Sequence, residues 1–325
     1  MKNISKSATL EYKFPLLAVE NNCIVSKEAD VTACFRVHLP ELFTVASAEY
    51  EAIHSAWYKA IKTLPDYTVI HKQDWYIKEN YAPNIAEDGL SFLGKPYQQH
   101  FNERPFLNHY CYVFITKTTK DRMRMQSNFS SLCRGNIIPK EVNKDTSVKF
   151  LEAVGQFERI MNDSGFIRLT RISSDEITGT DTSAGLIEKY FALSLDDTTC
   201  LEDLELGADG LRVGSKHVCL HTLSDAEDLP GRIGTDMRYE KLSTDRSDCR
   251  LSFASPVGLL LSCDHIYNQY LFIEDSAENL RKFEKSARNM QSLSRYSRGN
   301  QINKEWIDQY LNEAHSFGLT SIRAH

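Results

Sequence analysis

Two short hydrophobic runs near the start of the chain predict a β-hairpin. They lie within residues 16–26 and flank Asn21 and Asn22, a pair that tolerates the positive φ angles of a tight turn. Residues 29–39 then carry an apolar side chain at every second position, which is typical of a half-buried strand. The side chains expected on its buried face are those of Val31, Ala33, Phe35, Val37 and Leu39.

The spacing of apolar residues then changes and predicts a helix over residues 47–64. Ser47 suits the N-cap position, and Pro65 is a stop signal. The apolar residues recur at steps of three and four, so one face should pack on the preceding strands. That face carries Tyr50, Ile53, Trp57, Ile61 and Leu64. We expect strands at 67–71 and 110–116, separated by a long excursion at 81–105 that is rich in Pro, Gly and Asn.

After residue 139 the pattern starts afresh, and strands and helices occur in groups rather than in β-α-β alternation. This grouping favours an α+β fold with mixed or antiparallel sheets and packed helices. Helices are predicted at 146–162, 184–193, 277–296 and 301–317, and strands at 166–172, 218–223, 250–253, 257–263 and 266–273.

The length of 325 residues suits about two domains. We expect subdomains at residues 1–142 and 143–325, with the second ending in a helix pair. Residues 319–325 look like the first half of a strand that has no partner after it, so we expect the chain to be part of a longer protein.

Composition and charge place the chain among ordinary globular proteins. The net charge of −6 argues against a surface built wholly for nucleic acid, although a local basic face is compatible with it. The eight cysteines form no C-x-x-C pair, which favours reduced thiols in the cytosol. The most apolar run, residues 257–263, is far shorter than the roughly 20 residues that cross a bilayer. We therefore expect a cytoplasmic protein without a membrane span.

One segment approaches the spacing of a phosphate-binding loop, at Gly89, Gly94 and Lys95. The next residue should carry a hydroxyl for Mg²⁺, but Pro96 has neither a hydroxyl nor a backbone N–H. Residues 89–96 are therefore expected to form a loop without a nucleotide. The sequence contains neither a nucleophile elbow nor a complete nucleotide-binding motif, so no catalytic residue is assigned.

A second constellation places His217, Cys219 and His221 on alternate residues of a predicted strand. Zinc needs a fourth ligand, for which Cys249, Cys263 and His265 are candidates only by proximity in the sequence. On a straight strand His217 and His221 are roughly 13 Å apart, too far to share one ion. We expect no bound metal and keep a metal-dependent enzyme as a third hypothesis.

The most informative pattern is in the predicted helix 277–296, for which Ser276 is a suitable cap. At about 100° per residue, basic side chains line one side and apolar ones the other. The basic ridge consists of Arg281, Lys285, Arg288 and Arg295, and the apolar side of Leu280, Phe283, Ala287, Met290 and Ser294. Such a ridge is either a solvated helix face or a contact for an acidic partner or a phosphate backbone. The aromatic stripe of the next helix, with Trp306 and Tyr310, is expected in the core.

Several long stretches resemble the N-terminal region of the TraG ATPase family of conjugative transposons. They include HFNERPFLNHYCYVFITKTT and NDSGFIRLTRISSDEITG and lie at residues 3–45, 100–119, 162–179, 221–232 and 286–321. The family is similar to the large cytoplasmic ATPases of type IV secretion. The resemblance implies a motor that binds ATP and Mg²⁺ beyond residue 325, with no catalytic or cofactor residue in this chain.

Two further expectations concern partners. The resemblance implies that this region docks the motor on inner-membrane components of the transfer apparatus, peripherally and through protein contacts, or on neighbouring subunits by self-association. The alternative is a nucleic-acid-binding module that uses the ridge at Arg281, Lys285, Arg288 and Arg295.

Overall fold

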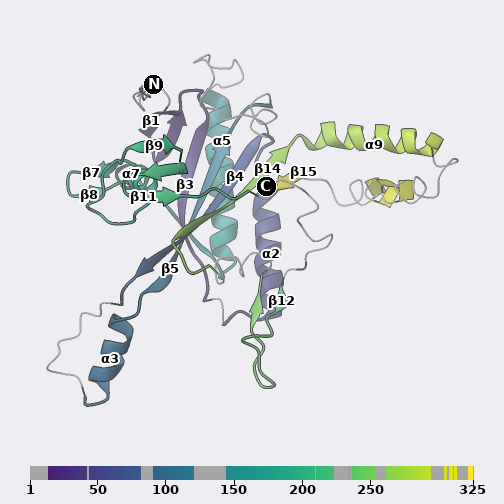
Figure 1. The fold of residues 1–325 in the computed structure, drawn as a ribbon. Helices are drawn as coiled ribbons and strands as arrows, with labels where there is room; N and C mark the ends of the chain where they lie inside the picture. Colours follow the sequence, from purple (N-terminus) through teal and green to yellow (C-terminus); the bar gives the residue numbers. More distant parts are fainter. Residues whose placement is uncertain are drawn as a thin grey trace.

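The chain folds around one antiparallel sheet (Figure 1). The computed structural model describes residues 14–41, 44–81, 91–120, 144–208, 210–222, 234, 236–252, 261–293, 304–305, 307–309, 311–312 and 321–324. Within them the sheet runs in the order β1-β2-β3-β5-β4-β14-β15, and β6 pairs with β3. The strands are β1 (Leu16–Glu20), β2 (Cys23–Ser26), β3 (Val31–His38), β4 (Thr68–Glu79), β5 (Phe106–Lys117), β6 (Arg168–Arg171), β14 (His265–Glu274) and β15 (Ser321–Ala324). The predicted α+β class with antiparallel sheets is confirmed.

The first hairpin forms as predicted. Asn21 and Asn22 have φ angles of 53° and 59°, and Glu20 pairs with Cys23 across the turn. The next strand, β3, differs from the prediction because it is buried on both faces: Cys34 and Phe35 are both fully buried although they point to opposite sides. The alternation of apolar residues indicated only one of these two cores.

One face of the sheet is covered by two helices, α2 (Ser47–Ile61) and α5 (Lys144–Asp163). Trp57 of α2 meets Phe157 of α5 edge to face, with ring centroids 5.7 Å apart. The helices bury Ala60, Ile61, Phe150, Val154, Phe157 and Met161 against β3, β4 and β5. The predicted cap at Ser47 is wrong by one residue: Ala46 occupies the N-cap, and its N–H donates to Glu49 Oε2 at 2.7 Å.

The opposite face holds a second core beneath α6 (Ser174–Thr178) and α7 (Leu186–Ala192). Its buried residues are Cys34, Trp75, Tyr112, Ile172, Ile177 and Leu186. Ser173 and Glu176 form a reciprocal capping box that starts α6, a helix that the periodicity did not predict because it has barely more than one turn.

Smaller sheets surround this body. One contains β9 (Leu204–Gly207), β10 (Gly210–Val213) and β11 (Lys216–Val218); two further pairs are β7 (Gly179–Thr180) with β8 (Ser183–Ala184), and β12 (Met237–Arg238) with β13 (Arg250–Leu251). The β12–β13 pair sits at the start of α2, where the Tyr50 hydroxyl donates to the Arg250 carbonyl at 3.1 Å. Most of the strand predicted at 257–263 lies outside the described residues.

Two predictions about strand ends are corrected. β4 and β5 each span twelve residues, well beyond the predicted 67–71 and 110–116, because polar side chains pair across them. The strand expected to lack a partner near the end of the chain is β15, which pairs antiparallel with β14. The main sheet contains strands from both sides of the expected boundary near residue 142, since β3 pairs with β6 and β4 pairs with β14. The division into two subdomains stays a prediction.

Candidate functional site

Helix α9 (Ser276–Leu293) carries the predicted basic ridge and follows β14 directly. Its cap is Asp275 rather than Ser276: Asp275 Oδ1 accepts the N–H of Glu278 at 2.9 Å. That backbone N–H, together with the Tyr67 hydroxyl 3.1 Å from Oδ2, holds the pKa of Asp275 below its usual value against the opposing effect of burial. Burial, followed by this hydrogen bond, raises the pKa of Tyr67 to about 12.

The first turn of α9 is tied to the sheet by further polar contacts. The Asn279 side chain donates to Glu274 Oε2 at 2.7 Å, and Glu278 forms ion pairs with Lys120 and Lys282. These contacts fix the direction in which the helix leaves the sheet, and the rest of α9 extends away from it (Figure 1).

The basic ridge is presented to solvent in the described part of α9. Arg281, Lys285 and Arg288 are exposed, and none of them has a carboxylate partner among the described residues. Arg295, the fourth predicted member, lies outside the described residues. The positive groups are therefore placed together, as the helical spacing predicts, and they can attract carboxylates or phosphates.

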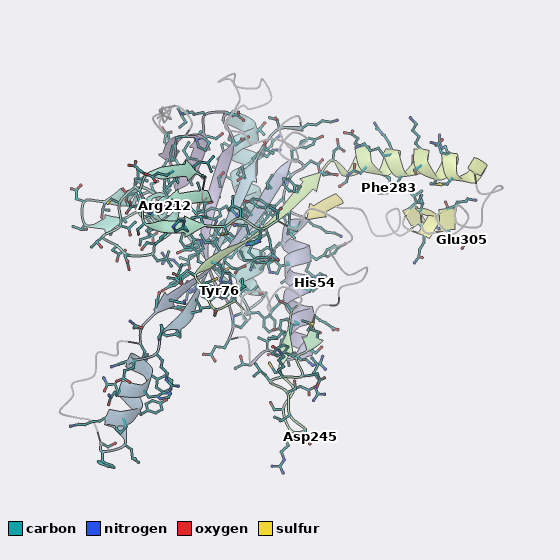
Figure 2. All side chains as sticks on the ribbon, viewed as in Figure 1. His54, Tyr76, Arg212, Asp245, Phe283 and Glu305 are labelled. Carbon is teal, nitrogen blue, oxygen red and sulfur yellow. The ribbon has the colours of Figure 1, made fainter. Side chains whose placement is uncertain are left out.

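The opposite side of α9 is apolar and incompletely covered. Leu280, Ala287 and Met290 are half-buried, whereas Phe283 is 38% exposed and stands on the projecting helix (Figure 2). The predicted second helix at 301–317 is helical at the described residues 304–305, 307–309 and 311–312; its aromatic stripe at Trp306 and Tyr310 lies outside them. Helix α9 therefore carries cations on one side and an exposed aromatic ring on the other, and Arg and aromatic residues are both enriched in protein contacts.

A polar cluster that the sequence did not reveal lies on β4 and β5. Asp74 is 2% exposed, His109 Nε2 donates to its Oδ1 at 2.9 Å, and Lys72 pairs with its Oδ2. The Tyr76 ring stacks between His109 and His265, with ring centroids 4.5 and 4.6 Å apart. Alternate positions of β4, on the face that carries Ile70, are occupied by Lys72, Asp74 and Tyr76. Charged residues at every second position of a strand were therefore the sequence signal that could have predicted this cluster.

The electrostatics of this cluster indicate a structural role. Burial tends to raise the pKa of Asp74, but the hydrogen bond from His109 and the charge of Lys72 outweigh it and hold the pKa below its usual value. Both carboxylate oxygens are occupied, so Asp74 orients its two neighbours rather than offering a base. Burial, reinforced by the Asp74 charge, raises the pKa of Tyr76 to about 12.

The residues of the metal hypothesis are not brought together. His217 lies on β11, Cys249 is buried beside β13, and His265 stacks on Tyr76. Throughout the part of the chain that the structure describes, no three His, Cys, Asp or Glu side chains converge as a metal-binding group. Cys219 and His221, the other two members of the motif, are both exposed.

The segment that resembled a phosphate loop is partly helical, which corrects the expectation of a loop. Gly94, Lys95 and Pro96 begin α3 (Gly94–Asn102), and the N–H of Gly94 donates to Ser91 Oγ at 3.1 Å. Gly89 lies outside the described residues. Pro96 is tolerated because the first N–H groups of a helix have no intrahelical acceptor.

Comparison with known proteins gives one family match. Residues 3–55 match the model of a family described as "Domain of unknown function, B. Theta Gene description (DUF3875)". No curated protein matches the chain. Among the described residues, no helix combines the length and the apolar character that crossing a bilayer requires.

The Asp74 cluster generates a stability prediction. Asp74→Asn removes the charge between Lys72 and His109, and we expect it to lower the free energy of unfolding by about 1–3 kcal/mol at pH 7. Because the folded pKa is depressed, the contribution of Asp74 is present above about pH 4, where the unfolded carboxyl ionises, and is lost as the pH falls through the folded pKa. Urea unfolding between pH 7 and pH 3 measures both effects.

Asp245→Asn is the matched control, since Asp245 is an exposed carboxylate on the turn beyond the β12–β13 pair (Figure 2). It should leave stability nearly unchanged. Equal losses in the two variants, or an Asp74 variant with the same acid sensitivity as the unmodified chain, would contradict a stabilising role for the cluster.

Proposed function

We propose that this chain is the non-catalytic assembly region of a conjugative-transfer ATPase of the type IV secretion class. In this proposal it positions a motor, which follows residue 325 and binds ATP and Mg²⁺, on the inner-membrane transfer apparatus. Support comes from the TraG-like stretches distributed between residues 3 and 321. The match of residues 3–55 to a domain family described from B. theta is compatible with that origin.

The observation that favours docking is the geometry of α9. Its root is fixed by Asp275, Tyr67 and Glu278, while the rest of the helix, with Phe283 on it, extends away from the sheet (Figure 2). A rigid sheet that carries a projecting two-sided helix suits contact with another protein. We place the region on the cytoplasmic side, associated with the inner membrane through its partners, and self-association remains a second mode of contact.

A capture experiment tests this proposal with charge-reversed chains. We expect the tagged chain, expressed in cells that carry the transfer apparatus, to retain transfer components identified by mass spectrometry. Arg281→Glu combined with Arg288→Glu should reduce that capture by about tenfold, because the unmodified basic ridge attracts an acidic partner surface and the acidic variant repels it. Circular dichroism verifies that the variant keeps its helix content.

Lys59→Glu on α2, combined with Lys62→Glu at its C-cap, changes the net charge by the same amount at two other exposed positions and should leave capture intact. The proposal fails if no transfer component is captured by the unmodified chain and deletion of residues 1–325 from the full-length protein leaves transfer intact. If both double variants lost capture equally, α9 would not be the contact surface.

The alternative function is nucleic-acid binding, and it draws on the same ridge. Arg281, Lys285 and Arg288 lie within one stripe of exposed helix, which matches the contacts that proteins make with a phosphate backbone. The acidity of the whole chain, with its net charge of −6, places this function second.

A salt titration of DNA binding separates the two functions. Phosphate contacts predict that the logarithm of the affinity falls with the logarithm of the salt concentration, with a slope of about −0.9 for each phosphate neutralised. The docking proposal predicts weak binding that is the same for the unmodified chain and for Arg281→Glu/Arg288→Glu. Tight binding with a steep slope that this variant flattens would instead establish the nucleic-acid function.

A further inference from the structure

A β-ribbon arm projects from the sheet where β4 and β5 outlast their neighbours. The two strands pair from Thr68 with Lys117 to Glu79 with Phe106. The pairing of β14 with β4 ends at Tyr76, and that of β3 with β5 ends at Cys111. Beyond these points β4 and β5 continue without another neighbour among the described strands, and they carry α3 at their far end (Figure 1).

Polar contacts stabilise the two-stranded ribbon of this arm. Glu79 accepts hydrogen bonds from the Tyr110 hydroxyl at 2.5 Å and from the Asn108 amide at 2.9 Å. The N–H of Lys78 donates to Asp264 Oδ1 at 2.8 Å, which ties the arm to the segment before β14. These contacts hold the two strands of the arm to each other and to the segment before β14.

The tip is apolar and uncovered in the described structure. Phe92 is 90% exposed and Leu93 77% exposed, at adjacent positions where the chain enters α3. Tyr97 and Phe101 continue this surface along α3, with ring centroids 4.7 Å apart, and Tyr81 lies beside Phe101. No residue of α3 is buried. Large apolar side chains gathered at the end of an arm mark a binding surface rather than scattered surface residues.

The polar residues around the tip indicate its partner. Lys95, His100 and Arg104 are exposed on α3 and just after it, and the carboxylate of this segment, Glu103, accepts a hydrogen bond from Gln99 at 2.7 Å. Phe and Leu at the extremity, Tyr behind them and cations at the rim form the arrangement of helices that lie in the interface of a bilayer. The rim cations complement anionic lipid headgroups.

We propose that residues 91–104, carried on the β4–β5 arm, insert their apolar tip into the surface of an anionic lipid bilayer. This inference deepens the proposed function, because it gives the docking region a direct lipid contact in addition to its protein contacts. The arm enters one leaflet without crossing the membrane, with Phe92 and Leu93 among the acyl chains and Lys95 and Arg104 at the headgroups.

Vesicle flotation tests the inference. The unmodified chain should float with vesicles of phosphatidylethanolamine and phosphatidylglycerol, and less with vesicles of phosphatidylcholine alone. Phe92→Ser combined with Leu93→Ser should reduce binding by at least about tenfold, since two large apolar side chains lose their burial. Both residues are exposed, so the fold should be unaffected, and a urea unfolding curve verifies this.

Leu206→Ser combined with Leu220→Ser is the matched control, because these leucines are 85% and 81% exposed but lie far from α3 along the chain. This control should bind vesicles like the unmodified chain. The inference is overturned if the unmodified chain fails to float, if both double variants lose binding equally, or if the arm variant floats normally. If the unmodified chain does not bind vesicles, and light scattering shows it as a dimer and the arm variant as a monomer, the tip would instead be a contact with a second copy of this chain.

The two proposals can fail separately. Loss of vesicle binding with intact capture of transfer components would remove only the lipid contact. Vesicle binding without capture would remove the assembly function and leave a lipid-binding arm.

Discussion

The pairing of β4 with both β5 and β14 is the constraint on which the rest of the structure depends. β4 pairs with β5 over its whole length and with β14 from Thr68 to Tyr76. At one end of this ladder β14 passes into α9, and at the other β4 and β5 continue alone as the arm. One set of backbone hydrogen bonds thus sets the direction of both projections, and neither needs a core of its own.

The register of this ladder is specified by what each face carries. Asp74 meets Lys72 and His109 on one face, while Trp75 packs with Tyr112 on the other. A slip of one residue would turn the carboxylate toward the aromatic core and the indole toward the charges. The polar cluster therefore contributes to specificity as well as to stability, and it separates the apolar core beneath α2 and α5 from the base of the arm.

The sequence predicted the features that depend on local periodicity. The hairpin at Asn21 and Asn22, the packed face of α2 and the exposure of Arg281 all follow from spacing along the chain. Features that depend on distant partners were missed. The ends of β4 and β5 and the partner of β15 are decided by residues far away in the sequence, and the polar residues of β4 look like a strand end until His109 is placed beside them.

The arm was missed for a related reason. Residues 81–105 have the Pro, Gly and Asn content of a long loop, and the short α3 carries no apolar stripe long enough to indicate a helix. What the sequence did contain is the run from Phe92 to Phe106, whose aromatic residues find no place in a core. Exposed aromatic residues in a predicted loop are thus the signal that points to such a surface.

Helix α9 and the arm are proposed as contact surfaces of different kinds, and photo-crosslinking in cells that carry the transfer apparatus tests this most directly. A benzoylphenylalanine would replace Tyr97 on the arm, Lys285 on α9 or, as a control, the exposed Tyr58 on α2. We expect lipid adducts from position 97, adducts with a transfer component from position 285, and neither from position 58. If neither position 97 nor position 285 gave adducts, or if position 58 gave them equally often, α9 and the arm would not be these contact surfaces.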